Sequence, residues 1–126
     1  MDTLIIRRIK NNIETKAYNF LFENLESTLK KVELIIRNEK PEIVGISSMT
    51  TNRVSTVRLV EMIKKTDPKI KVILGGVHPT IMWEQILTNY PVDYIVLGEG
   101  DETIIELVKA IEKSKDIRKV KGIVFK

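Results

Sequence analysis

Apolar and polar positions alternate along the chain in blocks that predict a series of strands and helices. Three short runs of almost continuous apolar residues, at 42–48, 70–74 and 92–97, have the length and composition of buried strands. Each run leads into a longer stretch in which apolar residues recur every three or four positions, which is typical of an amphipathic helix. These helices are predicted at about 53–65, 80–89 and 101–113.

The same pattern predicts elements at both ends of the chain. Residues 3–8 and 121–125 are expected to form short strands. A helix is expected over about 24–38, because its apolar positions recur at helical spacing and Pro41 bars its continuation. Residues 9–23 mix polar and aromatic positions and predict no particular element.

Strands that alternate with helices predict right-handed βαβ crossovers and a parallel sheet covered on both faces. The predicted fold class is therefore α/β: a doubly wound, mostly parallel sheet of about five strands in a Rossmann-like or flavodoxin-like three-layer sandwich. No repeat, linker or low-complexity segment interrupts the sequence, so residues 1–126 are expected to form a single domain.

Composition narrows the function classes. The chain has no cysteine, which excludes disulfides, thiolate catalysis and an iron–sulfur cluster held by this chain. No apolar run approaches the roughly 20 residues of a membrane span, and the N-terminus does not have the layout of a signal peptide, so a cytoplasmic protein without membrane contact is expected. The net charge of +4 does not predict nucleic-acid binding, since many of the basic residues fall near predicted helix C-termini and no basic stripe interleaved with aromatics accompanies them.

The three central strands all end in small, turn-forming residues. In a parallel α/β sheet, ligands bind just beyond the carboxyl ends of the strands, so these turns are the predicted site. The first turn supplies hydroxyls, the second removes side chains at a glycine pair, and the third places a carboxylate between two glycines. The residues of these turns are Ser47, Ser48, Met49 and Thr50; Gly75, Gly76, Val77 and His78; and Gly98, Glu99 and Gly100.

The turns also exclude some ligands. They contain neither a P-loop nor a complete G-x-G-x-x-G motif, and the third turn is acidic over 98–103. A polyphosphate such as ATP, GTP or NAD is therefore a poor fit. The pattern favours a large, weakly charged ligand that is bound through hydroxyls and backbone.

Taken together, "PEIVGISSMT" (41–50), "VILGGVHPT" (72–80), "VDYIVLGEGDETIIELV" (92–108) and "KGIVF" (121–125) resemble the cobalamin (B12)-binding domain found N-terminal to radical S-adenosylmethionine (SAM) enzymes. The resemblance is good over 40–125 and poor over 1–39. It implies a Rossmann-like domain that holds cobalamin, with its cobalt-bearing corrinoid, by extending the nucleotide tail into the crevice at the strand ends. In this family the corrinoid commonly serves methyl transfer by a radical SAM domain.

The resemblance also implies roles for the turn residues. Ser47, Ser48 and Met49 would line the nucleotide tail. Gly75, Gly76 and Val77 would pack under the tail, and residues 98–100 would border its far side.

The sequence departs from the family pattern near its N-terminus. It contains no Asp-x-His-x-x-Gly loop, whose histidine ligates cobalt in cobalamin proteins of the mutase type. The strand at 3–8 matches the family's second strand best, so the first strand and its loop are absent, and residues 3–8 are a candidate to take that central place.

Four residues near the predicted turns each have an expected role. His78, the only histidine, is expected to orient the turn and to ligate no metal, since no partner ligand accompanies it. Trp83 is expected to pack against its helix neighbours and not to form a corrin platform, although an exposed Trp83 would reopen that question. Asp93 is expected to be structural, whereas Glu99 has no evident folding role and is the better candidate for function.

Three hypotheses remain at this stage. The first is a cobalamin-binding module of, or derived from, a cobalamin-dependent radical SAM enzyme of the methyltransferase type, which is not catalytic alone and works with a radical SAM domain or chain. The second is a degenerate paralogue or fragment that has lost the ligand and serves oligomerisation or protein contact, a homodimer included. The third, a receiver-like phosphoacceptor, is disfavoured because the strands end in Ser47 and Gly75 where a receiver has acidic residues.

Overall fold

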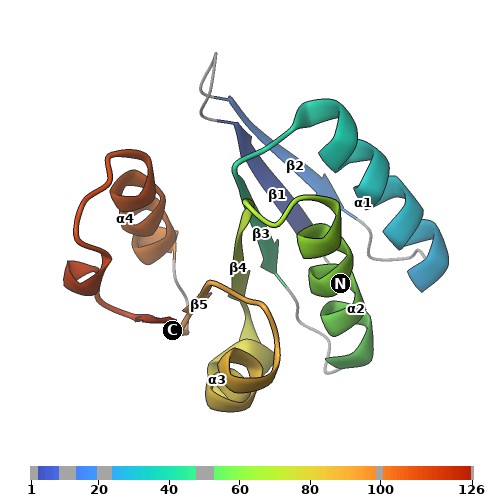
Figure 1. The fold of residues 1–126 in the computed structure, drawn as a ribbon. Coiled ribbons are helices and arrows are strands. Elements are labelled where there is room, and N and C mark those ends of the chain that lie inside the picture. Colours follow the sequence, from blue (N-terminus) through green and yellow to red (C-terminus); the bar gives the residue numbers. More distant parts are fainter. Residues whose placement is uncertain (1–2, 9–13, 20–23, 48–52, 99–100, 126) are drawn as a thin grey trace.

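The computed structural model describes residues 3–8, 14–19, 24–47, 53–98 and 101–125. These described residues form one sheet of six strands in the order β2-β1-β3-β4-β5-β6, together with four α-helices (Figure 1). The strands are β1 (Thr3–Arg8), β2 (Glu14–Asn19), β3 (Ile43–Ser47), β4 (Lys71–Gly75), β5 (Tyr94–Val96) and β6 (Ile123–Phe125). The helices are α1 (Leu25–Glu39), α2 (Arg53–Thr66), α3 (Val77–Asn89) and α4 (Asp101–Glu112), with a short 3-10 helix, η1 (Ile117–Lys119), before β6.

The predicted α/β class is confirmed, and the first five strands follow the flavodoxin-like order 2-1-3-4-5. Strands β3, β4 and β5 are parallel to one another. Two strands run in the opposite direction to these three: β1 is antiparallel to both β2 and β3, and β6 is antiparallel to β5. Four strands therefore point one way, and β1 and β6 point the other.

The N-terminal region differs from the expectation in one element. The segment that predicted nothing contains β2, which pairs with β1 as an antiparallel hairpin. Residues 3–8 do take the central place beside β3, as the comparison with the family pattern suggested. However, β1 is antiparallel to both β2 and β3, so it enters the sheet in the reverse direction.

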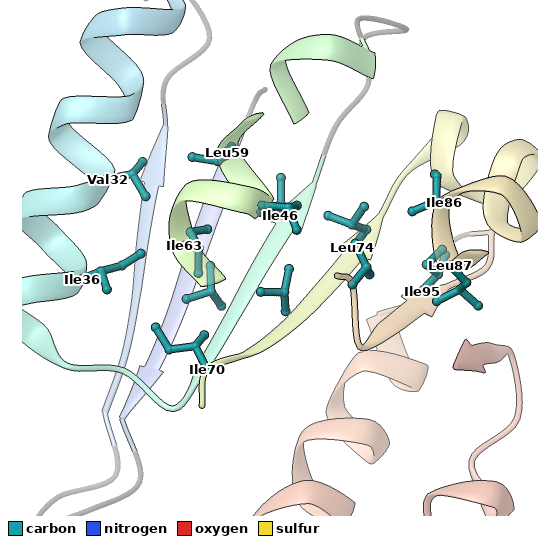
Figure 2. Packing of buried hydrophobic residues seen from close by; sticks show 14 residues of the cluster. Val32, Ile36, Ile46, Leu59, Ile63, Ile70, Leu74, Ile86, Leu87 and Ile95 are labelled. Atoms are coloured by element: carbon teal, nitrogen blue, oxygen red, sulfur yellow. The ribbon is translucent and has the colours of Figure 1, made fainter. Parts of the chain in front are cut away.

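Three helices cover one face of the sheet, which we call the three-helix face. Side chains of α1, α2 and α3 meet the inward-facing residues of β3, β4 and β5 there, as Figure 2 shows for Val32, Leu59, Ile63 and Ile86. Branched aliphatic residues at these strand positions favour extended backbone and fill the interior densely. This cluster is the larger of the two cores, and it holds the three central strands in register.

The opposite face is covered by α4 and is called the α4 face. Leu107 of α4 is fully buried against Ile43, Ile73, Tyr94 and Val96. Sheet residues alternate between the two faces, so neighbours two apart share a face. The structure is therefore the expected three-layer sandwich, with unequal layers of helix.

Candidate functional site

The carboxyl ends of β3, β4 and β5 lie together, and we call this end of the sheet the C-terminal rim (Figure 1). Ser47 at the end of β3 pairs in register with Gly75 at the end of β4. On the other side of Ser47 lies Thr3 of β1, followed by Asn19 of β2. The reversal of β1 therefore brings the start of that strand to the rim and sends its end, Arg8, to the opposite end of the sheet.

The α4 face has open space at this rim. By alternation with Ile43 and Ile73, the residues Gly45, Ser47 and Gly75 belong to the α4 face. Ser47 is exposed, and a methyl group built at Gly75 would meet no atom within 4 Å. A flat ligand group could thus lie against bare backbone at Gly75 with a hydroxyl beside it.

Glycines shape the backbone at two other points of the rim. Gly76 caps the start of α3 with a φ of 112°, and Gly98 follows β5 with a φ of 69°. L-residues with a side chain rarely adopt these angles, so both positions favour glycine for the turn itself. The described glycines of the predicted site thus have different roles: Gly75 leaves open space, Gly76 permits a turn, and Gly98 does both.

Helix starts also gather at the rim. The N-termini of α2 and α3 have no acidic residue in their first turns. The positive end of each helix dipole is therefore not neutralised by its own side chains. This arrangement favours a ligand that carries a single negative charge.

The structure places two predicted site residues in a helix and not in a turn, and five others lie outside the described residues. Val77 and His78, predicted in the turn, lie in the first turn of α3, which begins three residues earlier than expected. The helix can start there because Gly76 makes the turn and Pro79 is tolerated in a first turn. Ser48, Met49, Thr50, Glu99 and Gly100 lie outside the described residues.

Two other side chains can be placed. Trp83 was expected to pack within its helix interface, but it is 37% exposed and belongs to neither core cluster. Asp93 is structural, as predicted: its Oδ2 accepts hydrogen bonds from Lys64 Nζ at 2.6 Å and from the backbone N–H of Val72 at 2.8 Å.

The described groups with a shifted pKa are not among the predicted site residues. Burial, with a smaller effect of Asp93, raises the pKa of Tyr94 at the opposite end of β5. Hydrogen bonds from Arg118 hold the pKa of the exposed Asp116 carboxyl below its usual value. Among the residues that the structure describes, no three His, Cys, Asp or Glu gather where they could hold a metal ion. The rim is thus a binding surface of hydroxyl, backbone and helix ends.

One contact at the end of the sheet opposite the rim is not predicted by any sequence pattern. Arg7 of β1 donates from Nε to Glu112 Oε1 at the end of α4, across 105 residues of sequence. It also donates from Nη1 to Thr15 Oγ1 of β2 at 2.6 Å. Residue patterns do not predict this link, because it depends on the reversed direction of β1.

None of the helices in the described residues is long and apolar enough to cross a membrane.

Comparison with known proteins agrees with this geometry. The family model of the B12 binding domain matches residues 5–108. The chain is 36% identical over 85 residues to the anaerobic magnesium-protoporphyrin IX monomethyl ester cyclase of Synechocystis sp., covering 67% of this chain and 17% of that protein. It is 29% identical over 119 residues to an uncharacterized methyltransferase of Pyrococcus horikoshii, covering 94% of this chain and 26% of that protein.

A solved structure shares the fold. The radical SAM methyltransferase TsrM of Kitasatospora setae, with cobalamin and a 4Fe-4S cluster bound, superposes with a TM-score of 0.65 at 19% identity. The match covers 82% of this chain and 19% of that chain. The chain thus spans no more than about a quarter of the length of these relatives. Because the family model matches most of its length, the chain belongs to the B12-binding domain family.

Proposed function

We propose that this chain binds cobalamin at the C-terminal rim, with the nucleotide tail lying on the α4 face over Gly75. The observation that carries the proposal is the open space over Gly75, because a flat group needs a surface without a Cβ. The exposed hydroxyl of Ser47 lies in the adjacent strand position, where it could hydrogen bond to a ring nitrogen of the tail. The unopposed starts of α2 and α3 suit the single phosphodiester of that tail.

The chain's own residues would bind and orient the cofactor, and the bound corrinoid would supply the methyl-transfer chemistry. The thiolates that hold a radical SAM cluster would come from another domain or chain, since this sequence has no cysteine. The reversal of β1 bears on the cobalt ligand. In the mutase type a histidine loop follows the first strand, but here the end of β1 lies at the opposite end of the sheet from the rim. We therefore propose binding without a histidine supplied from that loop.

The test is a substitution that fills the space over Gly75. Gly75→Val should leave the fold intact, because a Cβ at this position meets no atom within 4 Å and a β-branched residue suits a strand. It should raise the Kd for hydroxocobalamin at least tenfold, measured by equilibrium dialysis with visible absorbance.

Lys71→Val is the matched control, since Lys71 is exposed on the same strand and face at the opposite end. This variant should bind as the wild type does. Equal affinity in Gly75→Val would show that the tail does not lie over Gly75. No saturable binding by the wild type at high micromolar ligand would favour the alternative, a module that keeps the fold and serves protein contact.

A further inference from the structure

Arg7 connects two parts of the molecule that the sheet alone does not hold together. Its guanidinium contacts Glu112 at the C-terminal end of α4 and Thr15 of β2. Both Arg7 and Thr15 therefore face the α4 side of the hairpin. Lys16, the next residue of β2, pairs with Glu39 of α1 on the three-helix face, as the alternation of a strand requires.

The part of the α4 face over the hairpin is not covered by α4. Thr15 and Ala17 of β2 share this face with Arg7, and both are exposed. The core contacts of α4 are with β3, β4 and β5, through Ile43, Ile73 and Tyr94 among others. Among the described side chains, no second hydrogen bond or ion pair links α4 to the hairpin. The α4 face is therefore open over the hairpin, and the open space at Gly75 lies on the same face at the C-terminal rim.

The Arg7–Glu112 pair is more shielded than the other arginine–carboxylate pairs described. The side chains are 27% and 11% exposed, compared with 61% and 41% for Arg37–Glu33. Partial burial strengthens an ion pair because less water screens the charges. A second hydrogen bond from the same guanidinium to Thr15 fixes its orientation. The pair is thus suited to hold α4 at a set position.

We propose that the Arg7–Glu112 pair sets the spacing between the β1–β2 hairpin and α4, and so the space on the α4 face that the cofactor tail would occupy. The inference rests on the proposed function for its ligand. In a sheet whose first strand is followed by a helix, that helix would pack beside α4 on the same face. Here β2 follows β1 in a hairpin. The ion pair between Arg7 and Glu112 would then position α4 in place of that helix. Arg7 and Glu112 are positioning residues, because they act at the end of α4 away from the rim.

The first measurement needs no ligand. The chain has no native cysteine, so spin labels can be attached at cysteines introduced at Ala17 and Glu106, both exposed. The distance distribution between the labels should be narrow in the parent protein and broad or shifted in Arg7→Met and Glu112→Gln. Lys16→Met is the matched control, because it breaks a hairpin–helix ion pair on the other face, and its distribution should match that of the parent.

The second measurement is cofactor binding. Arg7→Met and Glu112→Gln should each raise the Kd for hydroxocobalamin at least fivefold, mainly through faster dissociation. The exchanged pair, Arg7→Glu with Glu112→Arg, should recover most of the affinity, and Lys16→Met should retain it. A lowered melting temperature with unchanged label distances and unchanged Kd would overturn the proposal. If the wild type fails to bind cobalamin, the proposed function fails and so does the ligand role of the pair, while the label distances still decide whether the pair sets the spacing.

Discussion

At the end of the sheet opposite the rim, the side chains of Lys64 and Asp93 connect α2 to the starts of β4 and β5. Lys64 of α2 donates from Nζ to the backbone carbonyl of Ile70 at 2.6 Å and to Asp93 Oδ2 at 2.6 Å. The same carboxylate oxygen accepts from the N–H of Val72. The two side chains are only about a fifth exposed, so each would leave a poorly hydrated partner if the other were removed.

Asp93→Asn should therefore lower the free energy of unfolding by about 1–3 kcal/mol, because it removes one charge of a shielded pair and weakens the bond to Val72. Urea unfolding followed by circular dichroism measures this. Glu33→Gln, which breaks an exposed pair within α1, should cost less than about 0.5 kcal/mol. Equal losses in the two variants would contradict the structural role assigned to Asp93.

At the scale of elements, α1 shows how local chemistry defines a helix. Asn24 caps its start, accepting a hydrogen bond from the N–H of Ser27 at 2.8 Å, and Glu26 in the first turn complements the dipole. At the other end Lys40 adopts a φ of 49°, and its N–H donates to Ile36 at 2.9 Å. Pro41 follows, so the helix ends where the sequence predicts.

Asn24→Ala should destabilise the protein by about 1 kcal/mol, because the N–H of Ser27 loses its acceptor. Asn24→Asp retains an acceptor and adds a favourable charge at the helix start, so its stability should equal or exceed that of the wild type. Thermal unfolding of the three proteins tests this. A variant with alanine as stable as the wild type would show that the cap contributes nothing.

Across the whole molecule, the two faces of the sheet are stabilised unequally. Three α-helices pack on one face, as Figure 2 shows, whereas on the other face the smaller cluster forms around Leu107 of α4, with Ile117 of η1 packed against it. The smaller cluster buries less apolar area, so α4 should open locally more often than the central strands. The layer that opens more often would then be the one beside the proposed cofactor site at Gly75.

Leu107→Ala should cost about 2–4 kcal/mol and should speed amide exchange in α4 before it affects β3 and β4. Ile63→Ala, in the larger core, should speed exchange in all these elements together. Hydrogen exchange followed by mass spectrometry separates the two patterns. Uniform acceleration in Leu107→Ala would show that the two clusters unfold as one unit.

Much of the fold and part of the site could be predicted from residue patterns. The central strands and all four helices are predicted by their apolar spacing, and Ser47 and Gly75 lie together because parallel strands end on the same side of a sheet. Strand β2 was missed because Glu14–Asn19 has few apolar residues and pairs at the side of the sheet beyond β1. Exposure of Trp83 was also missed, since helical spacing alone does not say which flank meets the core.

The sequence by itself therefore determined the α/β class, the end of α1 before Pro41, and the small residues at the strand ends, because these follow from local backbone preferences and side-chain size. Only the tertiary structure decided the direction of β1, the open side of the α4 face and the link from Arg7 to Glu112. These depend on pairing between distant segments: whether β1 runs with or against β3 is decided by the short connection to β2 and by the energy of the complete sheet.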